Sequence, residues 1–532
     1  MFQKKRLWSV YALLLLVALG FRLFIALRLP NDEPDDGRVY AQLAVNMLEQ
    51  HVFSHESQPP YVPSIIRLPG YPLFLAGVYK VFGHGNNTAV RVVQAVIDTL
   101  TCGLIALVAF AWAVKDERRH RAAIVAFALA AVCPFTAIYV ATVLTEVITN
   151  FLAVAMVLAV TWAFKAMDLK RSLAWWGVSG LLVGLAVLFR PDSGLFAAAV
   201  GVTIVLWFGW RWDFKRLFLS GACLSLAFCV VLVPWTIRNY RVFHLFQPLS
   251  PAHGEMPGEF VPRGYLLWLR TWLDDERYIA PVLWSLDAKV LKVSDFPDRA
   301  FDSKEEKDRV AALLEQYNKG ASSADEEAQQ SDDSENTDDS DDSDNSDNTD
   351  EQPEEQQQPA QPEEVDVEMT PAIDAGFAQI GQERRARAPF RYYVVLPFKR
   401  AITLWADTHS QYYPFNGELL PLSDLDYDIH QQYWLPLFAV LTAIYSLLGV
   451  LGAVLLWFAR TPDSQHHEAR RWVLLAALLI FLRLGFFATL ENPEPRYTVE
   501  LFPFLIILAG AGASVIARRL ASNPTDAVGG MG

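Results

Sequence analysis

Residues 7–29 read LWSVYALLLLVALGFRLFIALRL, and the acidic loop NDEPDD follows at residues 31–36. An apolar run of this length is long enough to cross the ~30 Å hydrocarbon core of a bilayer as a helix. The run is longer than the apolar part of a typical signal peptide, and Arg22 and Arg28 stand where small residues would precede a cleavage site. We therefore interpret residues 1–29 as an uncleaved first transmembrane span.

Comparable apolar runs recur to the end of the 532-residue chain, of which 52% is hydrophobic. They predict an all-α polytopic membrane protein with about ten transmembrane helices, within a range of 9–13. The later spans are expected roughly at 89–114, 121–140, 144–166, 172–189, 193–210, 217–237, 434–459, 472–490 and 498–517. This pattern excludes an ordinary cytosolic enzyme and a secreted disulfide-rich domain. Basic residues gather only in short loops beside the apolar runs, so we expect no nucleic-acid partner.

One segment carries the net charge of −14. The stretch 325–368 holds 20 Asp and Glu residues and no Lys or Arg, so the remainder has a net charge of +6. Residues 320–368 are rich in Ser, Asp, Glu, Gln, Asn and Pro and have almost no large apolar side chains. Because such a segment cannot bury enough apolar surface to offset the loss of chain entropy, we predict that it is disordered.

The short connections between spans predict the orientation in the membrane. Connections on one side are rich in Lys and Arg, as at residues 4–6 and 518–519, and such loops face the cytoplasm. Both termini are then cytoplasmic. The predicted order is a first span at 1–29, an outer loop at 30–88, a transmembrane core at 89–237, an outer region at 238–433, C-terminal transmembrane helices at 434–517 and a cytoplasmic tail at 518–532.

Three outer segments have the pattern of amphipathic helices. Residues 38–50 and 71–82 place apolar residues at helical spacing, and we expect both helices to lie on the membrane surface. Residues 390–405 are amphipathic too, but Lys399 and Arg400 near the middle favour an interfacial helix over an eleventh span.

Charged residues just outside the first span are the leading candidates for chemistry. Asp32, Asp35 and Asp36 precede the first surface helix. A carboxylate there can deprotonate a hydroxyl or help to hold a metal ion, although capping of the helix by Asp35 or Asp36 is a simpler alternative. Arg67 comes just before a Pro-Gly-Tyr-Pro turn, and arginine forms forked hydrogen bonds to phosphate.

Other polar residues lie at the expected outer ends of later spans. Arg496 and Tyr497 can reach an anion at the membrane surface, and Arg238 can help to place a substrate, but interface anchoring explains all three as well. Glu146 opens a span and has a structural alternative of its own. His253 and Glu255 are weak candidates for ligands of a divalent metal ion, with a solvated loop as the alternative.

The order of these motifs resembles that of the GT-C superfamily of membrane glycosyltransferases. The similarity is to the branch related to dolichyl-phosphate-mannose protein mannosyltransferases and the lipid A aminoarabinose transferase. The similar segments are Asp36-Gly-Arg-Val-Tyr40, residues 67–76, residues 90–94, Thr145-Glu146, Arg190-Pro191, residues 234–240 and Arg496-Tyr497. No single motif is specific, and their sequence of appearance carries the resemblance.

The resemblance implies a GT-C-like fold and an inverting transfer of a hexosyl or pentosyl group from a polyprenyl-phosphate donor to an acceptor hydroxyl. It makes Asp36 the general base, with Asp35 and Asp32 as second choices. It assigns the donor phosphate to Arg67, Arg496 and Tyr497, and substrate positioning to Tyr40, Arg238 and Glu146. The expected location is a bacterial inner membrane with the active site facing the periplasm. Whether the acceptor is a protein, a lipid or a glycan stays open.

Two other functions remain as alternatives. A lipid-linked glycan polymerase or ligase also works on lipid-linked sugars at the outer face. A lipid or sugar transporter would place charged residues near the middle of the spans and broken helices in paired halves. Here the ionisable residues concentrate at the outer ends, which favours the transferase.

Overall fold

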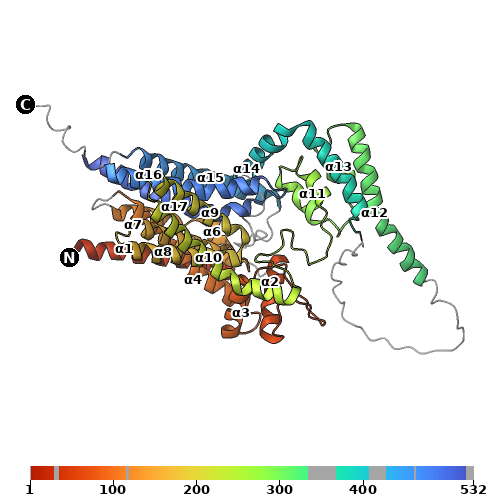
Figure 1. Ribbon diagram of the computed structural model, residues 1–532, viewed down its shortest axis with the longest axis horizontal. Coiled ribbons are helices and arrows are strands. Elements are labelled where there is room, and N and C mark those ends of the chain that lie inside the picture. The colour runs from red at the N-terminus through yellow and green to blue at the C-terminus, as the bar shows by residue number, and fades with distance from the viewer. Residues whose placement is uncertain are drawn as a thin grey trace, which may run out of the picture. The chain divides into compact units, whose positions relative to one another are not determined.

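The computed structural model describes residues 2–28, 35–114, 119–332, 367–406, 427–459 and 463–522, and within these ranges every regular element is a helix (Figure 1). The chain divides into two compact units. Unit 1 comprises Met1–Glu259, Ala401–Phe487 and Glu494–Gly532. Unit 2 comprises Phe260–Arg400 and Ala488–Pro493.

Unit 1 contains the candidate membrane spans. In the described ranges, nine helical segments are long and apolar enough to cross a membrane, or ten when one bent pair counts as a span. They are α1 (Phe2–Arg28), α4 (Asn87–Trp112), α7 (Glu146–Lys165), α8 (Leu169–Phe189), the segment Pro191–Gly209 with α9 (Gly194–Ile204), α10 (Phe214–Phe243), α15 (Tyr427–Trp457), α16 (Asp463–Ala488) and the segment Pro495–Arg518 with α17 (Phe502–Ser522). The all-α polytopic membrane architecture is thus confirmed.

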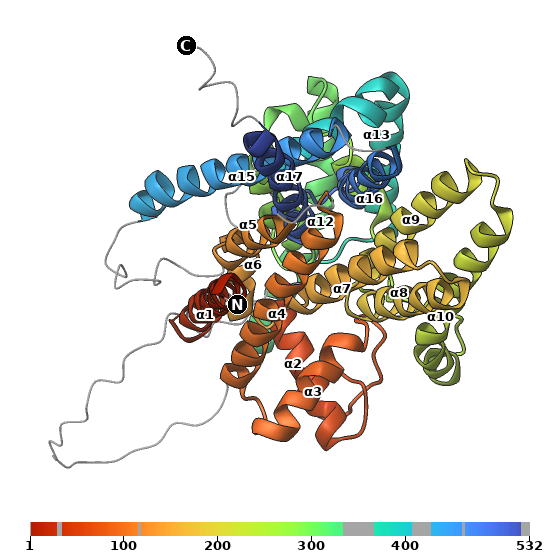
Figure 2. The same cartoon turned by 90° about the vertical axis from the view of Figure 1, so that its left-hand side faces the viewer.

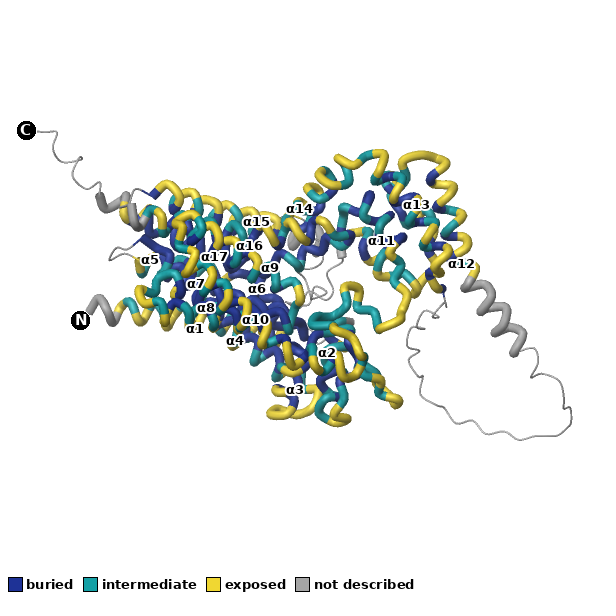
Figure 3. The backbone as a smooth tube through the Cα atoms, viewed as in Figure 1, coloured by how far each residue is buried: buried dark blue, intermediate teal, exposed yellow. Residues whose placement is uncertain are grey.

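Helices α7 and α17 are the innermost of these spans. Their most apolar windows are 78% and 89% buried, against 22% for α1 and 17% for α10. Helix α17 packs against α15, and α7 packs against α4 and α8 (Figures 2 and 3). A Cβ atom on Gly452 of α15 would lie 2.1 Å from the Leu508 carbonyl oxygen of α17. Glycine therefore lets the two backbones touch at this point.

The span predicted at 121–140 is present but broken. It consists of α5 (Arg119–Ala131), followed by α6 (Pro134–Ala137) and a 3-10 turn (Ile138–Ala141), with a bend of 52°. Pro134 has no N–H group, so the Ala130 carbonyl oxygen lacks the donor four residues on and accepts from the Cys133 N–H at 3.3 Å instead. Arg22 of α1 donates to this oxygen at 3.0 Å and to the Ala131 oxygen at 2.9 Å. The buried Arg22 is itself paired with Asp98 of α4 at 2.6 Å.

The first outer loop contains the two helices expected from its sequence. Helix α2 (Asp35–Glu49) packs against α3 (Gly70–Phe82). Leu43 and Ala44 of α2 are buried, as are Tyr71, Leu75 and Tyr79 of α3. The two helices therefore form a packed layer next to α4 rather than a pair of independent surface segments.

Unit 2 is a helical unit with its own core, which the sequence analysis did not anticipate. It contains α11 (Arg263–Leu269), α12 (Lys304–Asp332) and α13 (Pro371–Arg387). The core is strongly aromatic and includes Tyr265, Trp268, Trp272, Phe296 and Phe377. A Cβ atom on Gly264 of α11 would lie 2.1 Å from the Asp374 carbonyl oxygen of α13, so α11 and α13 approach backbone to backbone.

Residues 390–405 are helical, and no candidate span is found there. A π-helical turn (Arg391–Val395) leads into α14 (Leu396–Ala406). Arg400, which is buried, donates to the carbonyl oxygens of Leu273 and Arg270 at 2.7 and 2.6 Å. Its charge is thus accommodated within unit 2.

The structure describes both ends of the segment 320–368, for which disorder stays a prediction. Helix α12 continues to Asp332, because Ala, Glu and Gln in its last turns favour a helix. At the other end, Val367 is buried in the aromatic core of unit 2 and is followed by the buried Met369. Residues 333–366 lie outside the described part of the chain.

Candidate active site

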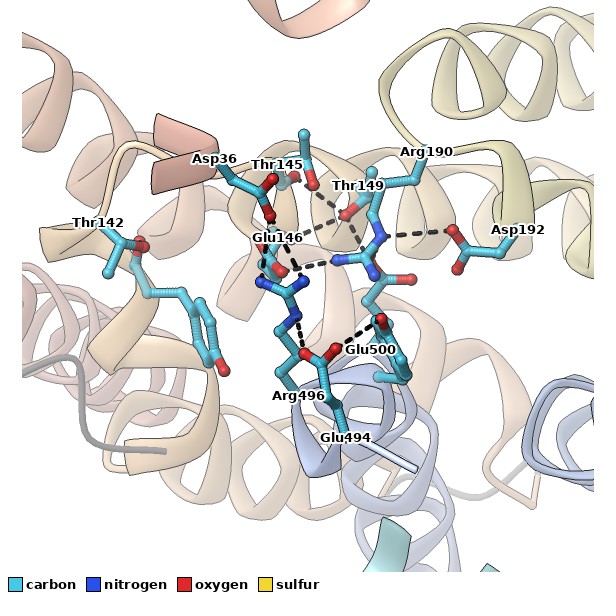
Figure 4. Close-up of polar contacts among 12 residues, drawn as sticks. Asp36, Thr142, Thr145, Glu146, Thr149, Arg190, Asp192, Glu494, Arg496 and Glu500 are labelled. Atoms are coloured by element: carbon cyan, nitrogen blue, oxygen red, sulfur yellow. Dashed lines mark hydrogen bonds and ion pairs between the residues drawn. The ribbon is translucent and has the colours of Figure 1, made fainter. Parts of the chain in front are cut away.

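Asp36 lies between two arginines that come from distant parts of unit 1. Its Oδ1 accepts from Nη2 of Arg67 at 2.8 Å. Its Oδ2 lies 3.4 Å from both Nη1 and Nη2 of Arg496. Asp36 is in the first turn of α2, Arg67 lies just before α3, and Arg496 lies in the 3-10 turn Pro495–Leu501 that precedes α17. The structure therefore brings together three of the residues assigned to the site from the sequence. Figure 4 shows the contact between Asp36 and Arg496.

The three side chains are half-buried and remain open to solvent. Their exposed fractions are 33% for Asp36, 29% for Arg67 and 23% for Arg496. Burial raises the pKa of the Asp36 carboxyl, but the charges of Arg496 and Arg67 outweigh it, so the pKa lies below the usual aspartate range. Asp36 is consequently an ionised carboxylate at neutral pH.

Glu494 holds Arg496 and Tyr497 in place. Its buried carboxylate contacts Nε of Arg496 at 2.5 Å and accepts from the Tyr497 hydroxyl at 3.0 Å. The Tyr497 ring stacks on Phe487, with centroids 4.3 Å apart. Tyr497 was assigned to the donor phosphate from the sequence. In the structure its hydroxyl points to Glu494, and its ring contacts the guanidinium groups of Arg190 and Arg496 at 5.7 and 5.6 Å.

A buried charge network lies behind these residues. Glu146 at the start of α7 accepts from Nη1 of Arg190 at 2.6 Å. The Arg190 Nε lies 3.4 Å from Asp192 and 3.5 Å from Glu500. Arg483 of α16 joins both carboxylates, at 2.5 and 2.7 Å. Two arginines thus face three carboxylates in this network, and pairing with the opposite charge is what allows these polar side chains to be buried together.

Tyr40 lies beside the cluster, whereas Arg238 contacts other groups. The Tyr40 ring packs edge-on against Tyr71, with centroids 5.2 Å apart, and burial raises its pKa to about 12. Arg238 donates to the Ser64 carbonyl oxygen at 2.8 Å, and its guanidinium lies over Phe53 and Trp235. These contacts connect α10 to the first outer loop. The assignment of Arg238 to substrate positioning therefore stays a prediction.

The remaining candidates have varied outcomes. Asp35 begins α2, its side chain is not described, and Asp32 lies outside the described residues. The Glu255 carboxylate accepts from the His253 backbone N–H at 3.0 Å. Among the described residues, no group of three or more His, Cys, Asp or Glu side chains is arranged to hold a metal ion. A divalent metal ion therefore stays a prediction without an assigned site.

Sequence reasoning missed several members of the cluster. Glu494 and Glu500 were not singled out, and neither was Arg483 within α16. A charged residue inside or beside an apolar span is itself a signal, and it would have identified Glu500 and Arg483. No signal in the sequence pairs these residues, because the pairing joins segments hundreds of residues apart.

Two comparisons with known proteins match this architecture. Residues 61–235 match the family model described as dolichyl-phosphate-mannose-protein mannosyltransferase. Over 98% of its length, the chain resembles the crystal structure of an Archaeoglobus fulgidus oligosaccharyltransferase tethered to an acceptor peptide, with 14% identity and a TM-score of 0.50. It covers 51% of that protein, so this chain spans about half the length of that enzyme.

Two further solved structures are similar at 14% identity. The archaeal oligosaccharyltransferase AglB from Archaeoglobus fulgidus, in complex with an inhibitory peptide and a dolichol-phosphate, has a TM-score of 0.49, with 100% of this chain and 53% of that chain covered. ArnT from Cupriavidus metallidurans bound to undecaprenyl phosphate has a TM-score of 0.36, with 96% and 79% covered. No curated protein sequence matches the chain.

The chain therefore has an all-α membrane fold similar to that of the oligosaccharyltransferase structure, and about a third of it matches the mannosyltransferase family model. Both findings agree with the resemblance to the GT-C superfamily that the motif order predicts. The family model matches a segment that holds Arg67, Glu146 and Arg190.

Proposed function

We propose that this protein is a glycosyltransferase that moves a sugar from a polyprenyl-phosphate donor to an acceptor hydroxyl with inversion at the anomeric carbon. The observation that carries the proposal is the Asp36 carboxylate held between Arg67 and Arg496 in a half-exposed position. A base and two phosphate-binding cations at one point are the groups that this reaction requires.

In this reaction, Asp36 takes the proton of the acceptor hydroxyl while the hydroxyl oxygen attacks the anomeric carbon. The bond between that carbon and the donor phosphate oxygen breaks, and the electron pair leaves with the polyprenyl phosphate. A single displacement from the face opposite the leaving group inverts the configuration. The proton on Asp36 then passes to solvent, which reaches this side chain because it is one-third exposed.

Arg67 and Arg496 stabilise the leaving group. Negative charge develops on the lipid phosphate in the transition state, and fixed guanidinium groups stabilise such charge without reorganisation. Glu494 holds Arg496 from the opposite side, at 2.5 Å from Nε. The terminal nitrogens of Arg496 therefore remain directed toward Asp36, where the phosphate would bind.

The location and the acceptor also belong to this proposal. Because the Lys- and Arg-rich connections face the cytoplasm under the positive-inside rule, the Asp36 site would face the periplasm of a bacterial inner membrane. The lipid tail of the donor would lie in the bilayer and its phosphate at the outer surface. The transferred group would be a hexose or pentose, and the acceptor a protein, a lipid or a glycan.

The test is a transfer assay with the purified chain in lipid, with radiolabelled polyprenyl-phosphate sugars as donors and membrane fractions as acceptors. Asp36→Asn should lower transfer by about 10²–10⁴-fold, the usual contribution of a general base. The matched control is Glu56→Gln, an exposed carboxylate of the same loop that lies outside the cluster. If Asp36→Asn transferred as much labelled sugar to the acceptor as the wild type does, the base would instead be Asp35 or Asp32.

The products also separate the alternative functions. Transfer that lengthens a lipid-linked glycan, with loss of a pyrophosphate carrier, would favour the polymerase or ligase. Movement of a lipid-linked sugar across the vesicle membrane without transfer would favour the transporter. The proposal requires a new glycosidic bond and release of polyprenyl phosphate.

A further inference from the structure

A cavity lies between α4 and α7, away from the Asp36 site. It has a volume of about 320 Å³ and is lined by apolar groups of Leu107, Phe110, Leu158 and Trp162, together with the cationic side chains of Arg119 and Lys165. One water molecule occupies about 30 Å³ in the liquid, so this cavity has roughly the volume of ten water molecules. It is large enough for a phosphate group with part of the molecule that carries it.

The cavity lies at the opposite end of the spans from the candidate active site. Glu146 is the first residue of α7, and Lys165 is its last. A helix rises ~1.5 Å per residue, so these two residues are roughly 30 Å apart along the helix axis. Phe110 likewise stands in the last turn of α4. The cavity and the Asp36 site therefore belong to opposite surfaces of the membrane.

The lining of the cavity changes from apolar side chains, deeper along the helices, to cationic side chains near the helix ends. Leu158 lies two turns before Lys165 on α7, and Leu107 lies deeper than Phe110 on α4. Leu107 and Trp162 are 51% and 39% exposed, and an apolar surface of this kind on a transmembrane helix faces the lipid chains. Trp, Arg and Lys side chains together are typical of the level of the lipid headgroups.

The two cations differ in how they are held. Lys165 pairs with Glu468 at 3.0 Å and bonds the Ala111 carbonyl oxygen. The Arg119 guanidinium lies 4.3 Å from the Phe110 ring centroid, and no carboxylate among the described residues lies within ion-pair distance of it. Among the described residues, the cavity is thus lined by two cations, of which one is paired with a carboxylate. Arginine is the side chain best suited to forked hydrogen bonds to phosphate.

We propose that this cavity binds the phosphate headgroup of an anionic membrane phospholipid, with Arg119 as its principal ligand and one acyl chain along Leu107 and Trp162. A free phosphate ion shares the headgroup chemistry, but it would leave the apolar lining in contact with water. A cationic side chain beside an apolar lining that faces the lipid chains fits a molecule with both a charged headgroup and an acyl chain. The proposal is independent of the activity proposed for Asp36.

The test measures lipid retention by the full chain, purified in detergent and analysed by native mass spectrometry after titration with phosphatidylglycerol. Arg119→Gln should weaken binding of the most tightly held lipid by about tenfold or more, as expected for loss of a charge-assisted hydrogen bond. Leu107→Trp fills the cavity without changing its charge and should weaken binding too. The matched control is Arg171→Gln, an exposed arginine at the start of α8 that does not line the cavity.

Phosphatidylcholine and sodium phosphate form the other arms of the experiment. The proposal expects phosphatidylcholine to bind more weakly than phosphatidylglycerol, and sodium phosphate not to displace the lipid at millimolar concentration. Retention of phosphatidylglycerol by both Arg119→Gln and Leu107→Trp at the wild-type level would overturn it. Displacement by sodium phosphate that depends on Arg119 would make the ligand a free phosphate rather than a lipid.

Discussion

In the proposed reaction, Asp36 and the donor phosphate would compete for the same guanidinium groups. Both carboxylate oxygens of Asp36 are engaged by arginine, Oδ1 by Arg67 and Oδ2 by Arg496. If a lipid phosphate neutralised these arginines, the Asp36 carboxylate would lose the charges that lower its pKa. It would then be a stronger base when the acceptor is deprotonated.

This competition predicts that removing the charge of Asp36 strengthens the binding of polyprenyl phosphate. Asp36→Asn should lower the Kd about threefold to tenfold, a modest effect because the ion pairs are half-exposed and screened by solvent. Microscale thermophoresis with undecaprenyl phosphate measures it. Arg67→Gln is the opposing control and should weaken binding. An unchanged or higher Kd for Asp36→Asn would show that the phosphate does not bind at these arginines.

The pH dependence of transfer follows from the pKa of Asp36. The two arginines hold this pKa below the usual aspartate range, so the wild-type base stays ionised until the pH falls below that range. In Arg67→Gln one of these charges is gone and burial still raises the pKa. The acid limb of kcat/KM should therefore move to higher pH in Arg67→Gln than in wild type. Coincident acid limbs would mean that a group other than Asp36 controls the rate.

Among the elements, the broken span depends on Arg22. This side chain joins α1 to Asp98 of α4 and donates to carbonyl oxygens at the end of α5. Removing the cation alone leaves a buried carboxylate unpaired, which costs about 3–5 kcal/mol. We expect Arg22→Met to lower the thermal unfolding midpoint in detergent strongly, and Arg22→Met with Asp98→Leu to restore part of the loss. If the double variant is no more stable than the single one, the ion pair is not the stabilising contact.

The elements also separate what the sequence can predict from what it cannot. Apolar runs predicted the spans, and helical spacing predicted α2 and α3, because both signals are local. The break before Pro134 was not predicted, although the proline is a local signal. The hydrogen bonds from Arg22 that stabilise the broken helix come from another helix, and the local sequence does not show them. The core of unit 2 was missed because its aromatic residues are spread over residues 265–377 without a regular period.

In the whole molecule, the candidate site is built from segments that the chain separates widely. Asp36 and Arg496 are 460 residues apart in sequence, and only the packing of the spans brings their ends together. Motif order assigned a role to each residue. It could not predict that one carboxylate is shared by two arginines, or that Glu494 directs Arg496 toward it.

The orientation of the whole chain gives the last prediction. The positive-inside rule places the first outer loop and the connection between α7 and α8 on opposite sides of the membrane. Ser57 is an exposed residue of the first outer loop, and Lys170 is an exposed residue at the start of α8, next to that connection. In spheroplasts, a membrane-impermeant maleimide should label Ser57→Cys, and it should label Lys170→Cys only after permeabilisation. The protein without either substitution is the control, because it shows how much label the exposed native Cys229 takes up. The reverse labelling pattern would place Asp36, Arg67 and Arg496 in the cytoplasm, where a periplasmic acceptor could not reach them.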